Sequence, residues 1–503
     1  MEKIKAYIKE HEYIFMFLFI GFSLVGVSLC VYLQNGDELW NFQNVYKMYN
    51  GYQIYKDANV IITPLFFIIG ESLFKILGAN IFVFRIYNVM IFVFYYFMTY
   101  LLLRKLKVKD KISVIIVCLL MLFQNYGLVR IMANYNPLAM ALCMLGIYML
   151  LDKKEYFTFK NILVQAIITF LIILTKQNIG IFYYIALLAV IIRNEKEKRV
   201  AKVLSVTSML GILGIVFLMI LQYNNILGDF INYTVIGIGD FAKNNVAILF
   251  NTTIIIISVL IISTYAVYIL TKNRKIHIDE RIKRNLIIIQ CFAISMIFTA
   301  LPIVNMAHFL MAIHIALILL VYIFKIILSE INIKNRKNKI LNILTYFIIA
   351  TIMIISAIRI YIWYTEISKN EYPYDYEEPF WGSIVNIEKQ QNIENVTTYI
   401  NDKKKQGKQV IVFSSKAALY MVPLKESNGY LDLAFYGNTG ELNDEEIRDG
   451  IRDLQDTEIL LEKNTDKLEW QERKELISNL KKELTKVGEI EEFEIYSIDS
   501  NLN

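Results

Sequence analysis

Residues 13–33 read YIFMFLFIGFSLVGVSLCVYL, an unbroken run without a charged side chain. A helix needs roughly 20 apolar residues to cross about 30 Å of hydrocarbon. Further runs of spanning or near-spanning length follow at 81–103, 112–129, 137–151, 161–175, 179–192, 201–221, 245–270, 286–301, 309–329 and 340–363. The sequence therefore predicts a polytopic α-helical membrane protein with about 11 transmembrane helices.

The composition agrees with this fold class. Of the 503 residues, 56% are hydrophobic and 19% are charged, whereas soluble proteins carry about 45–50% and about 25%. A single soluble domain, a disordered chain and a disulfide scaffold are excluded. The four cysteines lie in apolar runs and form no CxxC pair, which indicates small packing residues. The run at 13–33 is long and no small-residue cleavage motif follows it, so we do not expect a cleavable signal peptide.

Charge divides the chain in two. Residues 1–364 hold 35 Lys and Arg against 17 Asp and Glu, whereas residues 365–503 hold 17 against 29. All the apolar runs lie in the basic part. We therefore predict a transmembrane catalytic domain at 1–364, with an outer loop carrying interfacial helices at 34–80, and an extracytoplasmic α/β domain at 365–503.

Positive charge also predicts the orientation. Alternate connecting segments together hold 27 Lys and Arg, at 1–12, 104–111, 152–160, 193–202, 271–284 and 325–339. The remaining segments hold only Lys47, Lys56, Lys75, Arg85, Arg130, Lys176 and Lys243, with Arg359 near the last span. Because positive segments stay in the cytoplasm, we predict a multi-pass plasma-membrane protein with a cytoplasmic N-terminus and an extracytoplasmic C-terminal domain.

The acidic part predicts a small parallel α/β domain. Strands are expected at 409–415, 457–463 and 490–498. A capped helix begins at Asn443, in 443–455, and a charged amphipathic helix is expected at 466–486, closed by Gly488. The sequence here has no phosphate loop, Cys/His cluster or nucleophile motif. A lid, an acceptor contact and plain structural support are the roles left open.

The segment after the first run combines acidic and aromatic residues. It begins Asn35-Gly36-Asp37-Glu38-Leu39-Trp40, and adjacent carboxylates beyond a membrane helix are costly unless they face water, a partner or a substrate. An interfacial helix with aromatic side chains at headgroup level is predicted by the spacing of Tyr46, Tyr49, Tyr52 and Tyr55. The apolar segment 64–78 is too short to span. We expect an interfacial or re-entrant element that covers a cavity.

These motifs resemble those of the GT-C glycosyltransferases, in particular the protein O-mannosyltransferase and aminoarabinose transferase group (bacterial glycosyltransferase family 39-like). The matching stretches are Asp37-Glu38, Gly51-Tyr52-x-x-Tyr55-x-Asp57, Pro64-Leu65-Phe66-Phe67, Gly78-Ala79-Asn80-x-Phe82-x-x-Arg85, Asn134-Tyr135-Asn136-Pro137-Leu138, Leu174-Thr175-Lys176-Gln177 and His308-Phe309-Leu310. The resemblance covers residues 10–330, and the C-terminal domain resembles the extracytoplasmic domains of some bacterial members.

The resemblance implies transfer of a sugar, hexosyl or pentosyl, from a polyprenyl-phosphate donor to an acceptor hydroxyl on the outer face. Asp37 matches the family's general base, which takes the acceptor proton and contributes about 10²–10⁴-fold. A carboxylate there also favours the positive charge that develops on the sugar. Glu38 matches the second acid, which orients Asp37 or binds a hydroxyl. The alternative is that both acids only cap the following helix.

The donor phosphate needs cations, and Arg85, Arg130 and Lys176 are almost the only basic residues at outer helix ends. Arginine grips a phosphate with two parallel hydrogen bonds, and lysine supplies a point charge. Arg85 and Lys176 lie on matching motifs, whereas Arg130 is predicted from charge alone. The alternative for each is snorkelling to the interface or pairing with an acid such as Asp57.

Substrate contacts are expected from Tyr55, Asp57, Asn136 and His308, with a structural role as the alternative for His308. Many relatives carry a second acid where this chain has Asn134 and Asn136, so we predict no metal ligand set. If a divalent cation takes part, Asp57 has to serve as its ligand. No other cofactor is implied.

Two further functional classes compete with a glycosyltransferase acting on an envelope glycan, lipid or protein. A transporter or flippase of lipid-linked glycans predicts internal repeats with broken helices near the midplane, and no such repeat is evident. A non-catalytic scaffold that binds proteins through the acidic domain leaves Asp37 and Arg85 unexplained. Membrane lipids surround the protein in every case, and we expect no nucleic-acid partner.

Overall fold

The computed structural model of the chain describes residues 11–33, 36–126, 134–153, 157–195, 197–244, 247–248, 250–272, 278–301, 303–304, 306–330, 338–369, 377–385, 387–433, 435–468 and 472–498. The chain forms two compact units. The first, here called the helical unit, comprises Met1–Ser28, Asn88–Leu218 and Ala247–Ile362. The second, here called the mixed unit, comprises Leu29–Tyr87, Met219–Val246 and Trp363–Asn503.

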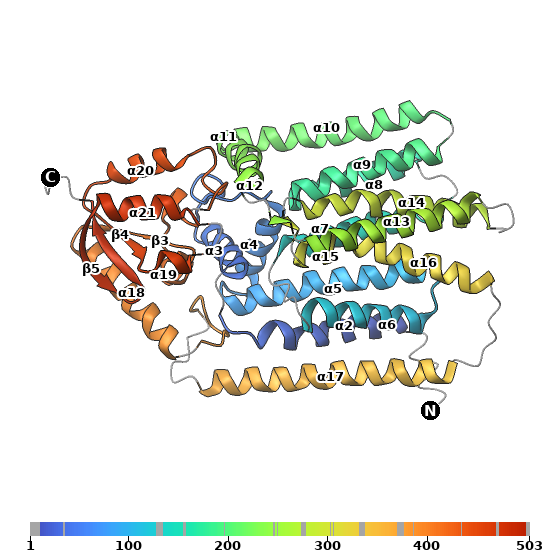
Figure 1. Cartoon of the computed structure of the whole chain (residues 1–503), viewed down its shortest axis with the longest axis horizontal. Helices are drawn as coiled ribbons and strands as arrows, with labels where there is room; N and C mark the ends of the chain where they lie inside the picture. The colour runs from blue at the N-terminus through green and yellow to red at the C-terminus, as the bar shows by residue number, and fades with distance from the viewer. Residues whose placement is uncertain are drawn as a thin grey trace. The chain divides into compact units, whose positions relative to one another are not determined.

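Apolar helices of different lengths build the helical unit, and they run side by side in Figure 1. They are α2 (Glu12–Leu29), α5 (Ile81–Lys105), α6 (Asp110–Met121), α7 (Tyr135–Leu150), α8 (Phe159–Thr175), α9 (Gln177–Asn194), α10 (Arg199–Tyr223), α13 (Phe250–Lys272), α14 (Glu280–Ile297), α15 (Met306–Ala312), α16 (His314–Glu330) and α17 (Asn338–Lys369). A π-helical turn at Leu122–Tyr126 continues α6, and β1 (Ala247–Ile248) pairs in parallel with β2 (Ile303–Val304). Most of the apolar runs predicted from the sequence lie on one of these helices, but the run 309–329 is divided between α15 and α16, and the run 245–270 includes β1 before α13 begins.

Within the described residues, seven helices are long and apolar enough to cross a membrane: α2, α5, α9, α10, α13, α14 and α17. The apolar helices α7, α8 and α16 are shorter. The prediction of a polytopic α-helical membrane protein is therefore confirmed, while the number of 11 spans stays a prediction.

Polar side chains join α7, α8 and α9 inside the helical unit. The Tyr183 hydroxyl donates to Gln165 Oε1 at 2.6 Å, and Gln165 Nε2 donates to the Gly146 carbonyl at 3.1 Å. A side chain at Gly146 would overlap the Tyr183 hydroxyl, so glycine allows this close approach. Small residues and interhelical hydrogen bonds of this kind favour helix association where lipid removes the hydrophobic driving force.

The mixed unit contains a four-stranded sheet in the order β3-β4-β6-β5. Its strands are β3 (Gln409–Phe413), β4 (Thr457–Glu462), β5 (Thr485–Ile490) and β6 (Phe493–Ser497). The helices around it are α18 (Ile387–Lys405), α19 (Ala417–Leu424), α20 (Asp444–Arg452) and α21 (Lys474–Glu483). The core includes Ile411, Ile459 and Tyr496 from three strands, together with Ile447 and Leu476 from two helices.

The sheet is mixed, so the predicted all-parallel arrangement is wrong in part. Strands β3 and β4 are parallel, but β6 pairs antiparallel with both β4 and β5. The helix expected at 466–486 is shorter, and Gly488 lies within β5 instead of closing a helix. The helix beginning at Asn443 is confirmed, because its side chain and that of Glu446 form a reciprocal capping box.

The segment predicted to form an outer loop contributes two short helices to the mixed unit, α3 (Asp37–Tyr49) and α4 (Leu65–Leu77), and α3 packs on α4 and on α19. The expectation of one helix through Tyr55 is wrong, because α3 ends at Tyr49 and Gly51 follows with a φ of 93°. Two more short helices of this unit are α11 (Leu227–Ile231) and α12 (Ile238–Asn244), joined by a π-helical turn at Asn232–Gly237. The domain boundary at 364/365 stays a prediction, but the C-terminal residues share their compact unit with residues 29–87.

Candidate functional site

The adjacent acids Asp37 and Glu38 occupy the first turn of α3 but have different surroundings. Asp37 is exposed, whereas Glu38 is 3% exposed. Gly36 holds the capping position with a φ of 87°, a conformation that glycine adopts without strain. Negative charge is favoured at this end of a helix because the unpaired backbone N–H groups point there. The pair therefore presents one carboxylate at the surface and one in the interior.

Glu38 is held by Arg85 in a bidentate salt bridge. Arg85 Nε lies 2.9 Å from Glu38 Oε1, and Arg85 Nη2 lies 3.1 Å from Glu38 Oε2. The remaining N–H groups donate to the backbone carbonyls at the end of α2: Leu29 (3.5 Å), Val31 (2.9 Å) and Tyr32 (3.4 Å). The arginine is 1% exposed, and each of its five N–H groups has an acceptor.

This geometry favours a positioning role for Arg85 over the expected phosphate contact. The guanidinium fixes residues 29–32 relative to the first turn of α3, and it has no N–H group left for a phosphate oxygen. The same loop is held from its other side, because Lys389 Nζ donates to the Leu33 carbonyl at 2.8 Å. The start of α3 is therefore anchored by side chains from two distant parts of the sequence.

Helix α3 buries an unusual number of polar side chains, which the sequence reasoning missed. Among the described residues, three of its buried N–H groups have no hydrogen-bond acceptor: Trp40 Nε1, Gln43 Nε2 and Asn44 Nδ2. An unsatisfied buried donor costs about 1–3 kcal/mol, and such donors are retained where water or a ligand supplies the acceptor. The sequence signal that could have revealed these buried groups is the stretch Asn41-Phe42-Gln43-Asn44, in which three of four side chains are polar amides.

The C-terminal end of α3 carries a buried ion pair, Lys47 with Asp432, whose partners are 3% and 2% exposed. The Asp432 carboxylate also accepts from Ser427 Oγ at 2.9 Å and from the Asn428 backbone N–H at 3.2 Å. These bonds satisfy the carboxylate that neutralises the lysine. The Lys47–Asp432 ion pair itself joins α3 to a turn of the C-terminal residues.

Tyr55 and Asp57, both expected to contact substrate, lie in a tight turn of the mixed unit. Tyr55 is 1% exposed; its hydroxyl donates to the Ile62 carbonyl at 2.9 Å and its ring packs on Phe230. Burial raises the pKa of Tyr55 well above its usual value. Asp57 Oδ2 accepts from the Gln53 backbone N–H at 2.7 Å. Both side chains hold the turn in shape, and their contact with a substrate stays a prediction.

A second cluster of predicted residues lies in the helical unit around Lys176. This residue alone separates α8 from α9, in an extended conformation. Its Nζ lies 2.6 Å from Asn136 Oδ1 and 5.1 Å from the centre of the Tyr135 ring. Asn134 caps α7 by accepting from the Asn136 backbone N–H at 2.8 Å. The structure thus brings together the asparagine and lysine motifs that are 40 residues apart.

His308, on the short helix α15, belongs to the same cluster. Burial lowers the pKa of His308 to about 3, and the nearby positive charge of Lys176 acts in the same direction. The imidazole is therefore neutral at pH 7 and offers one donor and one acceptor. Lys176 therefore contacts Asn136 directly and lies near enough to the neutral His308 to affect its charge.

The predicted phosphate contact of Arg130 and the predicted lack of a metal site both stay predictions. Arg130 lies outside the described residues. In the part of the chain that the structure describes, no group of three or more His, Cys, Asp or Glu side chains could hold a metal ion. The predicted residues otherwise fall into two groups, Asp37, Glu38, Tyr55, Asp57 and Arg85 in the mixed unit and Asn136, Lys176 and His308 in the helical unit.

Comparison with known proteins shows which solved structures share this architecture. No family model and no curated protein sequence matches the chain. Among solved structures, ArnT from Cupriavidus metallidurans, crystallised with undecaprenyl phosphate, matches with a TM-score of 0.57. The match covers 98% of this chain and 99% of ArnT at 11% sequence identity. The chain has a GT-C fold.

The oligosaccharyltransferase of Archaeoglobus fulgidus matches with a TM-score of 0.46 at 10% identity, in its complex with Zn and sulfate and in its apo form. These matches cover 82% and 84% of this chain and 61% and 65% of the oligosaccharyltransferase. The expected GT-C-like architecture, membrane helices followed by a small C-terminal sheet domain, is confirmed by the full-length likeness to ArnT.

Proposed function

We propose that this GT-C protein is a glycosyltransferase of the plasma membrane. It moves a sugar from a polyprenyl-phosphate donor to a hydroxyl group of an envelope glycan, lipid or protein on the outer face. The likeness to ArnT over almost the whole of both chains supports this class of reaction. The observation that supports the mechanism is the different environment of the two adjacent acids. Glu38 is buried in a salt bridge with Arg85, whereas Asp37 is exposed and can reach an acceptor.

In the proposed reaction, the acceptor oxygen attacks the anomeric carbon of the donor sugar. The bond between that carbon and the phosphate oxygen breaks, and polyprenyl phosphate leaves with the bonding electrons. Asp37 takes the proton from the acceptor hydroxyl, which contributes about 10²–10⁴-fold. Glu38 and Arg85 act as positioning residues, because their salt bridge fixes the first turn of α3.

The leaving phosphate needs positive charge, and we assign this role to Lys176, with Arg130 as the second candidate. The Lys176 ammonium group is held by Asn136 Oδ1 and the Tyr135 ring, so its position is fixed before a phosphate arrives. Neutral His308 adds a hydrogen-bonding group and no charge.

The test uses purified protein in nanodiscs with labelled polyprenyl-phosphate hexose and pentose donors and an envelope extract as acceptor. We expect Asp37→Asn to lose about 10²–10⁴-fold in transfer rate with an unchanged thermal unfolding midpoint. Glu445→Gln is the matched control, since Glu445 is an exposed acid in the first turn of α20. Full activity of Asp37→Asn would remove the proposed base, and donor translocation without a covalent product would favour a flippase.

A further inference from the structure

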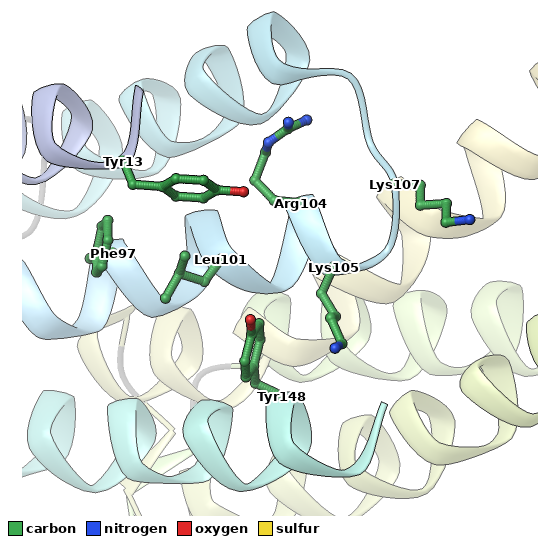
Figure 2. A pocket seen from close by; sticks show the side chains of 7 residues that line it. All are labelled: Tyr13, Phe97, Leu101, Arg104, Lys105, Lys107 and Tyr148. Atoms are coloured by element: carbon green, nitrogen blue, oxygen red, sulfur yellow. The ribbon is translucent and has the colours of Figure 1, made fainter. Parts of the chain in front are cut away.

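A cavity of about 620 Å³ opens in the helical unit at the C-terminal end of α5 (Figure 2). Its walls are aromatic and apolar, formed by Tyr13 of α2, Phe97 and Leu101 of α5, and Tyr148 of α7. Three cations complete the lining: Arg104, Lys105 and Lys107. This volume falls within the range of about 300–1,000 Å³ that is usual for small-ligand sites.

The three cations have different roles at this cavity. Arg104 is tied to the protein: Nη2 lies 3.1 Å from Glu12 Oε1, and Nη1 pairs with Asp110 and lies 2.9 Å from the Val108 carbonyl. These bonds hold α2 and the turn after α5 in place around the opening. Arg104 therefore shapes the rim, and its charge is already balanced by two carboxylates.

Lys105 and Lys107 have no acidic partner among the residues that the structure describes. Lys105 extends from α5 toward Tyr148, with Nζ 5.1 Å from the centre of that ring (Figure 2). Lys107 is exposed in the turn that follows α5. Lys107 is also close enough to Lys325 of α16 for its charge to repel it, whereas the nearby Arg281 pairs with Asp152. This end of the helical unit therefore carries positive charge that an anion would neutralise.

We propose that this cavity binds the headgroup of an anionic phospholipid from the cytoplasmic leaflet. The lysines would contact its phosphate, and the acyl chains would lie along Phe97 and Leu101. The positive-inside pattern places residues 104–111 at the cytoplasmic face, away from the proposed transfer reaction on the outer face. Basic pockets between membrane helices on this side favour anionic lipid headgroups. A soluble anion would gain nothing from the apolar wall.

The test measures lipid binding to the purified full-length protein by native mass spectrometry, with phosphatidylglycerol against phosphatidylcholine as probes. We expect the double variant Lys105→Gln/Lys107→Gln to bind phosphatidylglycerol about 30-fold more weakly, since each lysine near an anionic lipid surface contributes about 1 kcal/mol. Leu101→Trp fills the apolar wall without a change in charge and is expected to weaken binding as well. Binding of phosphatidylcholine is expected to change little.

The control pair Lys109→Gln/Lys160→Gln removes the same charge from exposed lysines that do not line the cavity. We expect it to leave phosphatidylglycerol binding unchanged, and circular dichroism confirms that each variant is folded. Equal weakening by the control pair would show attraction to general surface charge and overturn the proposal. Binding of inorganic phosphate as tight as that of phosphatidylglycerol would overturn it too, in favour of a soluble-anion site.

Discussion

Replacing Arg85 by methionine distinguishes a positioning role from a phosphate-binding role. The side chain is 1% exposed, and its salt-bridge partner Glu38 is 3% exposed. Removing one partner of a buried ion pair costs about 3–5 kcal/mol, because the other charge stays buried without compensation. The carbonyls of Leu29, Val31 and Tyr32 lose their donor in the same step. We therefore expect Arg85→Met to destabilise the mixed unit strongly and to loosen residues 29–38.

A double-mutant cycle gives the coupling between the two side chains. Glu38→Gln keeps the shape of the side chain but loses the charge-assisted bonds, for which we expect about 1.5–3 kcal/mol. Because the two residues contact each other, the double variant Glu38→Gln/Arg85→Met is expected to lose less than the sum of the single variants, by about 0.5–3 kcal/mol. The measurements are unfolding in detergent and hydrogen exchange of residues 29–38.

A phosphate ligand would behave differently. In that case Arg85→Met would raise the KM for the donor while unfolding and hydrogen exchange at 29–38 stayed at wild-type values. That combination of results would refute the positioning role.

Other perturbations test the remaining parts of the structure. Asp432→Asn leaves the buried Lys47 without a carboxylate, so we expect about 3–5 kcal/mol of destabilisation and faster proteolysis at residues 425–433. Lys176→Gln is expected to raise the donor KM at least about tenfold, the effect of losing one charge-assisted bond of about 1.5 kcal/mol, with little change in the unfolding midpoint. The carboxylate of Glu494 reports on acid stability. Burial raises its pKa, but hydrogen bonds from Lys481 and a second lysine outweigh this and lower it to about 2. Since the ordinary value is about 4.3, this stabilisation is present at neutral pH and is lost as the pH falls from about 5 to about 2. Near-UV circular dichroism should show Lys481→Met losing less stability over this acid range than wild type.

The membrane helices could be predicted from the sequence because each one is encoded locally. An apolar run such as 340–363 has one stable solution in lipid, a helix that satisfies its own backbone, and α17 covers that run. The C-terminal sheet was harder. Strand β5 begins at Thr485, inside the charged stretch 466–486 that predicted a helix, and the bond from Lys486 to Glu494 crosses to β6. The turn between these strands uses Glu491 at a φ of 46° and lacks the usual Asn-Gly signal.

Candidate site residues could be predicted where they belong to a local sequence motif. Their interaction partners could not be predicted where these lie far away in the sequence. The sequence indicated that Arg85 has a partner, because cations are rare on the predicted outer side. It could not indicate that this partner is Glu38, 47 residues earlier, instead of a phosphate or Asp57. The pairing of Lys47 with Asp432 had no local signal at all, since only the folded chain brings these residues together.

The Lys47–Asp432 contact also sets an order of events during biosynthesis. The two residues are 385 positions apart. At a synthesis rate of roughly 5–20 residues per second, the outer loop waits about 20–80 s for its counter-charge to leave the ribosome. A nascent chain therefore carries an uncovered cation beside the candidate site until the last part of translation. Because α3 is complete only with that ion pair, its maturation depends on synthesis of the C-terminal residues.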